Sequence, residues 1–364
     1  MKTFLNFILS SFISFLTMSQ EIDSLKNRIV WDFEVVDNMA PELINVYSEI
    51  NEGVFSFSKG NHEKALEIFN SVISKGYEVS KSYSNRGSVY FEMKEYNLAL
   101  IDYTKAIKLD SLQPDYWYNR GLLHQEINNI DLAVLDYSRA LQINPSHFFS
   151  AFKLGNYYAF VNQNDQMAFN VLNAYLNNSN SKKEDAGIYF IRGVILNRNE
   201  KSEQSVKDFD SAIALDSTNS DYFYNRGLAH FKIKNYSRAI RDYTIALRLN
   251  PFDGRINYNR ALVYSSQKEF DKAISDYTID IKLNGPTAKA YNNRGRCYMI
   301  LNNFNNALAD YQKALELEPK RPLTLYNLGL LYLRNGNTEK GCPYLKEAKE
   351  LGYPDTEIYD QYCK

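Results

Sequence analysis

The chain has few of the residues that interrupt helices and almost no excess charge of either sign. Among its 364 residues there are nine prolines and sixteen glycines, and the formal net charge is -1 at pH 7. The scarcity of turn formers favours one extended array over two or three ordinary globular domains. A nearly neutral chain with a pI of about 6.5 has no basic footprint for nucleic acid or for an anionic membrane surface.

The sequence also lacks the common signatures of catalytic and metal-binding sites. It contains no H-E-x-x-H motif, no phosphate-binding glycine loop, no G-x-S-x-G elbow and no Cys/His cluster at metal spacing. His124 and His230 occupy a repeat position that is tyrosine in several other repeats, so we interpret them as core residues. We predict a protein that is not an enzyme and uses no cofactor and no metal.

The first nineteen residues differ in composition from the rest. Lys2 precedes an apolar run from Phe4 to Met18, and small residues stand at Thr17 and Ser19. This pattern predicts a secretory signal peptide, residues 1–19, cleaved after Ser19. The run is short against the ~20 apolar residues that span a bilayer, but retention as an anchor or burial as a core helix stays open. We therefore expect an exported protein, periplasmic or secreted, that contacts a membrane only if this segment is retained.

Self-similarity at a fixed period dominates the rest of the chain. The tripeptide Asn-Arg-Gly begins at Asn85, Asn119, Asn225 and Asn293. Except across one irregular interval, its copies are separated by 34 residues or by a multiple of 34. Extending the register gives nine units, and every step is 34 residues except the fourth, which is 38. The units begin at Val46, Ser80, Pro114, Phe148, Ala186, Ser220, Gly254, Ala288 and Pro322.

Within each unit, residue types recur at fixed positions, counted from the unit's first residue. Position 8 is glycine in eight units, position 20 is mostly small, position 24 is usually aromatic and position 27 is alanine in seven units. Positions 4, 8 and 11 form one helical stripe, and positions 20, 24 and 27 form another. Since glycine inside a helix costs about 1 kcal/mol against alanine, its recurrence indicates a close contact between two antiparallel helices.

These residues resemble the tetratricopeptide repeat family, whose pattern is W-x2-L-G-x2-Y…A-x3-F…P. The third unit shows it most clearly, in Trp117, Gly121, Ala133, Tyr137 and Pro145. The resemblance runs from about Val46 to Tyr353. It implies an all-α fold, a right-handed α-solenoid of nine helix-turn-helix units, with the first helices lining a concave groove. A C-terminal helix would cap the array.

Arginine at position 7 departs from the family's usual leucine, and it is accompanied by aspartate at position 23 of the same unit. The predicted pairs are Arg86–Asp102, Arg120–Asp136, Arg192–Asp208, Arg226–Asp242, Arg260–Asp276 and Arg294–Asp310. The three units without the arginine also lack the aspartate. This all-or-none pairing predicts a salt bridge between the two helices of a unit, although simple duplication of an ancestral module would also produce it.

The fourth and seventh units are irregular. The fourth has Met167 and Val171 at positions 20 and 24, and we assign its four extra residues to a polar loop at Asn177–Glu184. We expect a seam there, either a hinge or a longer loop with intact stacking. In the seventh unit Asp280 replaces alanine at position 27, and it should reach solvent or find a cation, because a buried unpaired carboxylate is costly.

The C-terminal segment begins where a tenth unit would start, and we predict that it forms the capping helix. It would bring Cys363 near Cys342, so an exported location permits a disulfide between them, with free thiols as the alternative. The predicted organisation is a signal peptide (1–19), a lead segment (20–45), units one to four (46–179), a linker loop (180–185), units five to nine (186–355) and a capping helix (356–364).

The candidate binding site is the face of the first helices, where asparagine recurs at position 6 and aromatic residues at position 5. By resemblance to the peptide-binding members of the family, this ladder would hold an extended backbone. The candidate residues are Asn85, Tyr118, Asn119, Tyr224, Asn225, Tyr258, Asn259, Asn293, Tyr326 and Asn327. The alternative is that duplication merely copied them.

We therefore predict a non-catalytic exported scaffold that binds a protein or peptide partner. An assembly module of an envelope complex, self-association, and a carbohydrate-binding accessory protein are the alternatives, because aromatic grooves also stack sugars.

Overall fold

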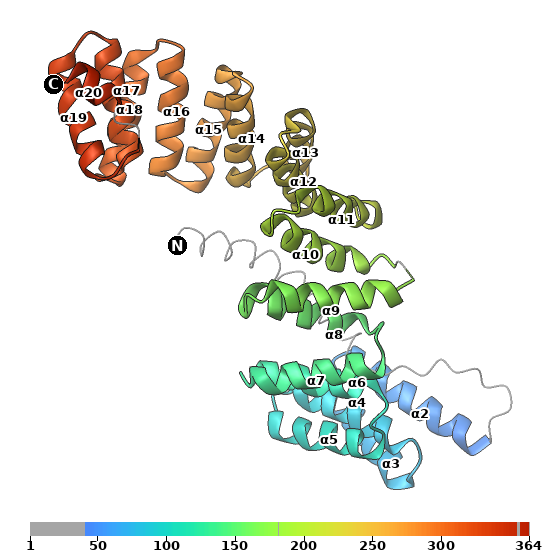
Figure 1. Ribbon diagram of the computed structural model, residues 1–364. Helices are drawn as coiled ribbons and strands as arrows, with labels where there is room; N and C mark the ends of the chain where they lie inside the picture. Colours follow the sequence, from blue (N-terminus) through green and yellow to red (C-terminus); the bar gives the residue numbers. More distant parts are fainter. Residues whose placement is uncertain (1–40, 181, 355–356, 364) are drawn as a thin grey trace. The chain divides into compact units, whose positions relative to one another are not determined.

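The computed structural model describes residues 41–180, 182–354 and 357–363, and the side chains from residue 45 onward (Figure 1). The predicted signal peptide and most of the predicted lead segment lie outside these residues. Throughout the described ranges the chain forms helices and no strands, as the repeat predicts. None of the helices in these ranges is both long enough and apolar enough to cross a membrane.

The chain divides into two compact units, residues 1–195 and 196–364, and each is described by itself. The first contains α2 (Pro41–Ser58), α3 (His62–Lys75), α4 (Val79–Glu92), α5 (Tyr96–Leu109), α6 (Pro114–Glu126), α7 (Ile130–Ile143), α8 (Phe148–Asn156), the π-helical segment η2 (Tyr157–Val161), α9 (Asp165–Asn178) and most of α10 (Asp185–Arg198). The second continues with α11 (Ser202–Leu215), α12 (Ser220–Lys232), α13 (Tyr236–Leu249), α14 (Gly254–Ser266), α15 (Phe270–Asn284), α16 (Ala288–Ile300), α17 (Phe304–Leu317), α18 (Pro322–Arg334), α19 (Thr338–Glu350) and α20 (Glu357–Tyr362).

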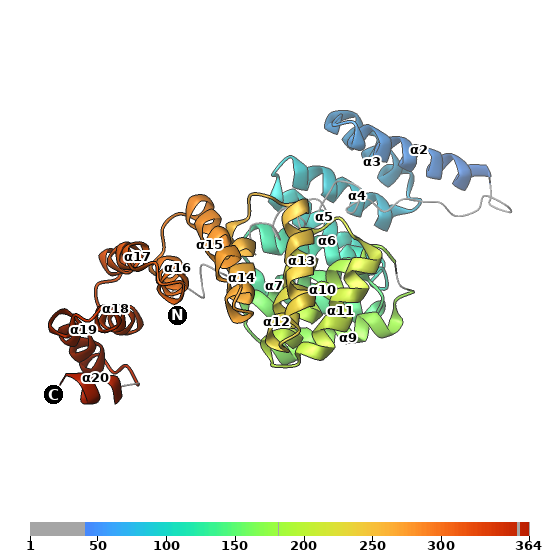
Figure 2. The same ribbon diagram turned by 90° about the horizontal axis from the view of Figure 1, so that it is seen from above.

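The helices pair in the order that the repeat predicts. Figures 1 and 2 show α14 beside α15 and α16 beside α17, each pair joined by a tight turn. Six first helices begin at the first residue of their predicted unit: α6, α8, α12, α14, α16 and α18. The main difference is α2, which begins at Pro41 rather than at Val46. Proline starts α6 and α18 without loss, because the first helical residue has no intrahelical N–H partner.

Close helix packing explains why small residues recur at the same positions of the repeats. A Cβ atom on Gly227 would lie 2.7 Å from Cε1 of Tyr243, and one on Gly121 would lie 2.7 Å from Cε1 of Tyr137. Glycine therefore lets the aromatic ring at position 24 lie against the first helix. The alanine at position 20 is fully buried beside it, as Ala239 and Ala99 illustrate.

The fourth repeat contains a π-helical segment that the sequence alone did not reveal. Because a π-helix accommodates one extra residue, every later position of this repeat moves by one. Ala168 and Leu172 are therefore buried in place of Met167 and Val171, and Met167 is exposed. Placing all four extra residues in the Asn177–Glu184 loop was wrong, since one of them lies in η2.

The loop between α9 and α10 is organised by one buried carboxylate. Asp185 accepts hydrogen bonds from the Tyr175 hydroxyl at 2.5 Å, from the Ser179 hydroxyl and from the Lys182 backbone N–H. These bonds connect the end of α9 to the start of α10 within the first compact unit. Whether this loop acts as a hinge stays a prediction.

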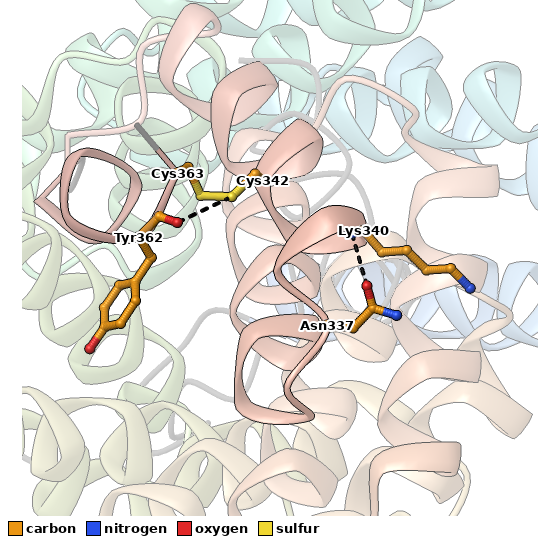
Figure 3. The surroundings of a disulfide bond; sticks show 5 residues. All are labelled: Asn337, Lys340, Cys342, Tyr362 and Cys363. Atoms are coloured by element: carbon orange, nitrogen blue, oxygen red, sulfur yellow. Dashed lines mark hydrogen bonds between the residues drawn. A yellow bond between two sulfur atoms is a disulfide. The ribbon is translucent and has the colours of Figure 1, made fainter.

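The C-terminal helix α20 is attached covalently to the last repeat. Cys342 of α19 and Cys363 form a disulfide with their Cα atoms 5.4 Å apart (Figure 3). Tyr353 stacks on Tyr326 with ring centroids 4.3 Å apart, and Ile358 and Tyr359 pack on the same cluster. Asn337 caps the start of α19 by accepting the Lys340 backbone N–H. The apolar end of the array is thereby covered.

Candidate protein-binding surfaces

Four of the asparagines at position 6 connect neighbouring repeats. Asn259 donates through Nδ2 to the Tyr224 hydroxyl at 3.0 Å, and Asn293 donates to the Tyr258 hydroxyl at 3.1 Å. The acceptor is in each case the position-5 side chain of the preceding repeat. Two further bonds follow the same rule: Asn119 to Ser84 at 3.4 Å and Asn327 to Asn292 at 3.0 Å. The asparagine ladder is thus first of all a set of links between consecutive first helices.

This geometry corrects the predicted binding site. Six of its ten residues are buried, and their side chains cannot meet a partner on an open surface: Asn85, Tyr118, Asn119, Tyr224, Tyr326 and Asn327. The tyrosines at position 5 pack instead on the position-24 ring of their own repeat. Tyr118 lies 5.8 Å from Tyr137 and Tyr224 lies 6.0 Å from Tyr243, centroid to centroid. These position-5 rings belong to the core because they pack on the position-24 ring.

Four predicted residues remain half-buried, and all four lie in the second compact unit. They are Asn225 on α12, Tyr258 and Asn259 on α14, and Asn293 on α16. Asn225 donates to the Asp221 backbone carbonyl, and Asn259 donates to both the Tyr224 hydroxyl and the Arg255 carbonyl. Because both Asn259 N–H groups are used, its amide offers a partner the Oδ1 acceptor rather than both a donor and an acceptor.

The positively charged side chain of Arg255 lies beside these asparagines and is held in place by its neighbours. Arg255 donates to Asp253 in a bidentate manner, from Nε to Oδ1 at 2.9 Å and from Nη2 to Oδ2 at 2.5 Å, and it lies over the Tyr224 ring, 5.6 Å from its centroid. The hydrogen bond to Asp253 raises the pKa of Arg255 further, so the guanidinium is charged at every relevant pH. Burial meanwhile raises the pKa of the Tyr224 hydroxyl, which therefore stays protonated and accepts from Asn259 in one fixed arrangement.

The predicted arginine–aspartate salt bridges form in five repeats. In each, Nε and Nη2 of the arginine bond to the two carboxylate oxygens at 2.7–2.9 Å. The pairs are Arg86–Asp102, Arg120–Asp136, Arg226–Asp242, Arg260–Asp276 and Arg294–Asp310. The carboxylates are buried, with 3–7% of each side chain exposed. The partners of the sixth pair, Arg192 and Asp208, belong to different compact units, and this salt bridge stays a prediction.

Four of these five arginines also bond to the preceding repeat, a contact that the sequence did not indicate. Arg226 Nη1 bonds to Asp210 at 2.6 Å, and Arg294 Nη1 bonds to Thr278 at 2.9 Å. Arg86 and Arg260 make the equivalent bonds to Asn70 and Thr244. One guanidinium therefore fixes a first helix to two second helices, that of its own repeat and that of the repeat before it.

His124 and His230 are buried, as predicted for core positions. Burial lowers the pKa of both imidazoles, and the nearby aspartates, at 3.9 Å, oppose that shift only in part. No group of three or more acidic, histidine or cysteine side chains in the described ranges is arranged to hold a metal ion.

Asp280 departs from its prediction: it neither reaches solvent nor pairs with a cation. It is 4% exposed, and the Asn284 amide donates to it at 2.7 Å. Burial raises the pKa of Asp280 to about 6, and the Asp253 charge adds to the shift. The single amide explains how a carboxyl is tolerated at a position where other repeats carry alanine.

Replacing Asp280 by alanine is expected to stabilise the protein at neutral pH. Since the pKa is higher in the folded than in the unfolded state, the wild-type residue contributes favourably below pH ~4 and loses that contribution as pH rises through ~6. We expect the alanine variant to have a free energy of unfolding about 1–2 kcal/mol higher than the wild type above pH 7, and almost no difference at pH 4. Urea denaturation of D280A and of D280N across this range measures it. A gain that is independent of pH would contradict the explanation.

Family models described as tetratricopeptide repeat match residues 114–147, 220–253 and 288–321. Others described as TPR or tetratricopeptide repeats match residues 87–128, 254–278 and 310–342. Together with the paired helices they decide the family. The chain is a tetratricopeptide repeat protein.

Among curated proteins, this tetratricopeptide repeat protein is similar to the mitochondrial import receptor subunit TOM34 of Homo sapiens and of Pongo abelii. Each is 36% identical over 92 residues, which is 25% of this chain and 27% of the relative. The chain thus spans about a quarter of the length of these curated relatives.

Three solved structures match the chain at low identity and with TM-scores below 0.5. A MamA fragment from Desulfovibrio magneticus RS-1 is 19% identical with a TM-score of 0.45, covering 46% of this chain and 94% of its own. The Cut9–Hcn1 heterotetramer of the APC/C is 14% identical with a TM-score of 0.49, covering 89% of this chain and 64% of its own. YrrB, described as a TPR protein with an unusual peptide-binding site, is 20% identical with a TM-score of 0.38, covering 61% of this chain and 95% of its own.

Tetratricopeptide repeat proteins bind protein partners and are typically non-enzymatic scaffolds. The matching families include no catalytic one.

Proposed function

We propose that this protein is an exported, non-catalytic scaffold that holds an extended segment of a partner protein on the first-helix face of α12, α14 and α16. One observation carries the proposal. Asn225, Asn259 and Asn293 are half-buried, recur one repeat apart, and are oriented by internal hydrogen bonds. A pre-ordered row of polar groups binds without the entropic cost of ordering them first.

The chemistry of this row favours a peptide backbone as the ligand. The Oδ1 atoms of Asn225 and Asn259 are acceptors suited to backbone N–H groups, which every extended peptide presents at regular intervals. Arg255, held by Asp253 beside the row, supplies a charged donor for a carbonyl or a carboxylate of the partner.

Export rests on two features of the chain. Lys2 and the apolar run Phe4–Met18, followed by Thr17 and Ser19 at cleavage spacing, support a signal peptide. The disulfide between Cys342 and Cys363 suits an oxidising compartment. N-terminal sequencing of the protein from the secreted or periplasmic fraction should begin at Gln20, and recovery of the full-length chain in the cytosol would contradict export.

The binding proposal is tested with the mature chain, residues 20–364, and a displayed library of unstructured peptides. Peptides that the protein selects should bind the N225A/N259A variant about tenfold more weakly, because each lost hydrogen bond contributes about 0.5–1.5 kcal/mol. R241A is the control, since Arg241 is exposed on the second helix α13. N225A alone removes only a bond within α12, so its effect on affinity is separable from an effect on stability. Equal affinity for wild-type and variant proteins would exclude this face.

A further inference from the structure

The second helices α5 and α7 carry exposed apolar residues at two positions where most other repeats are polar. At position 19 these two repeats have Leu98 and Leu132, both exposed. Six other repeats have polar residues there, and the shifted register of the fourth repeat places the exposed Met167 at this position: Lys64, Gln204, Arg238, Lys272, Asn306 and Lys340 are the polar ones. At position 22 they have Ile101 and Leu135, each 64% exposed. Duplication of a module does not explain exposed large apolar residues at both positions, which only these two adjacent repeats possess.

Each of these helices borders a surface hollow. The hollow beside α7 has a volume of about 390 Å³, and its apolar wall consists of Trp117 from α6 with Leu132 and Leu135 from α7. The hollow beside α5 has a volume of about 530 Å³ and is lined by Tyr83 from α4 with Leu100 and Ile101 from α5. Both α5 and α7 pack against α6, so the two hollows belong to consecutive repeats of the first compact unit.

The charge of the hollows is positive. Asp102 and Asp136 lie in their walls, but each is already neutralised by a two-pronged bond from Arg86 or Arg120. The additional cations are Lys105 and Lys108 in the hollow beside α5 and Arg139 in the hollow beside α7. Arg139 lies over the Trp117 ring, 5.8 Å from its centroid, which holds its charge at the rim of the apolar wall.

We propose that this α5/α7 face (Leu98, Ile101, Leu132 and Leu135 with Lys105, Lys108 and Arg139) binds an acidic peptide segment that carries aliphatic or aromatic side chains. The hollows accept the apolar side chains, and the surplus cations pair with the carboxylates. This second surface rests on the proposed scaffold function and adds to it a site distinct from the first-helix face of α12, α14 and α16.

Concavity favours a peptide over a lipid surface as the occupant. A flat bilayer would meet the protruding leucines but would leave both hollows empty, whereas single side chains of a peptide fill them. In protein interfaces, most of the binding energy comes from a few side chains that are buried in well-packed pockets. Apolar side chains of a peptide in these two hollows would be buried in this way.

The test uses the mature chain and three fluorescein-labelled synthetic peptides: one of alternating Glu and Leu, one in which Lys replaces Glu, and one in which Ser replaces Leu. The Glu/Leu peptide should bind at least about tenfold more tightly than either of the others. I101E/L135E should weaken its binding at least about tenfold, as should K105E/K108E/R139E. Because all five positions are exposed on helix surfaces, circular dichroism should show both variants folded.

S275E is the matched control, since Ser275 is the exposed position-22 residue of the seventh repeat. It should bind the Glu/Leu peptide like the wild type. Equal binding of the Glu and Lys peptides, or full binding by I101E/L135E, would overturn the proposal. Binding to phosphatidylglycerol vesicles in place of the peptide, lost in I101E/L135E, would assign the face to a lipid surface instead. N225A/N259A separates the two sites: it should leave this peptide's affinity unchanged even if the proposed first-helix site is correct.

Discussion

Replacing Arg226 by leucine is expected to destabilise α12 and α13 by about 3–5 kcal/mol. Leucine is the natural residue at this position in two other repeats, Leu154 and Leu328, so its shape is accepted there. The loss comes from Asp242, whose carboxylate is only 3% exposed and would lose its two guanidinium bonds. The bond from Arg226 to Asp210 would be lost as well. Amide hydrogen exchange in α12 and α13 measures the change locally, as a repeat array requires.

A double-mutant cycle separates the pair from its surroundings. D242N keeps the shape but removes the charge, so R226L/D242N should recover a large part of the loss, with a coupling energy of at least about 2 kcal/mol. Lys64 and Glu52 are the control pair: they are 2.8 Å apart but about half exposed, and their coupling should not exceed about 1 kcal/mol. If Arg226 and Asp242 show no more coupling than this control, the salt bridge does not stabilise the repeat.

Reducing the disulfide is expected to free the C-terminal helix α20. The bond joins residues 21 apart, and closing a loop of this size stabilises the closed state by about 3 kcal/mol. None of the six residues of α20 is fully buried, so apart from the disulfide it is held by the partial packing of Ile358 and Tyr359 and by the exposed Lys349–Asp360 ion pair. Hydrogen exchange in α20 should accelerate about a hundredfold after reduction or in C342S/C363S.

C297S is the control for this prediction, because Cys297 is a buried free thiol distant in sequence from the cap. Reduction should change exchange in C297S as much as in the wild type, and should change nothing in C342S/C363S. Two alkylated cysteines in addition to Cys297 in the unreduced, unfolded protein would show that the bond does not form.

The arginine–aspartate pairs were predictable because both partners occur, or are absent, in the same repeats. Their second bonds, to the preceding repeat, were not predictable. The acceptors Asn70, Asp210, Thr244 and Thr278 all lie 16 residues before their arginine, but their side chains differ and share only an oxygen acceptor, so residue type did not reveal the pairing.

The candidate binding site was predicted less well. A recurring asparagine beside a recurring tyrosine has the same sequence pattern whether the two side chains face a ligand or each other. The structure shows that Asn259 and Asn293 bind the tyrosines of the preceding repeat, and that Tyr118, Tyr224 and Tyr326 are core residues. The α5/α7 face was missed because Leu98, Ile101, Leu132 and Leu135 read in the sequence as ordinary apolar helix residues.

The sequence by itself determined the helix pairs, their period, the close contact at the position-8 glycine and the residues joined inside each repeat. All of these depend on spacing along one or two neighbouring helices, which a regular period of 34 residues records directly. Tertiary structure alone decided which recurring side chains are buried between repeats and which remain available to a partner. It also decided the register of the fourth repeat, because a single π-helical turn moves the packing stripe by one residue and leaves no mark in composition.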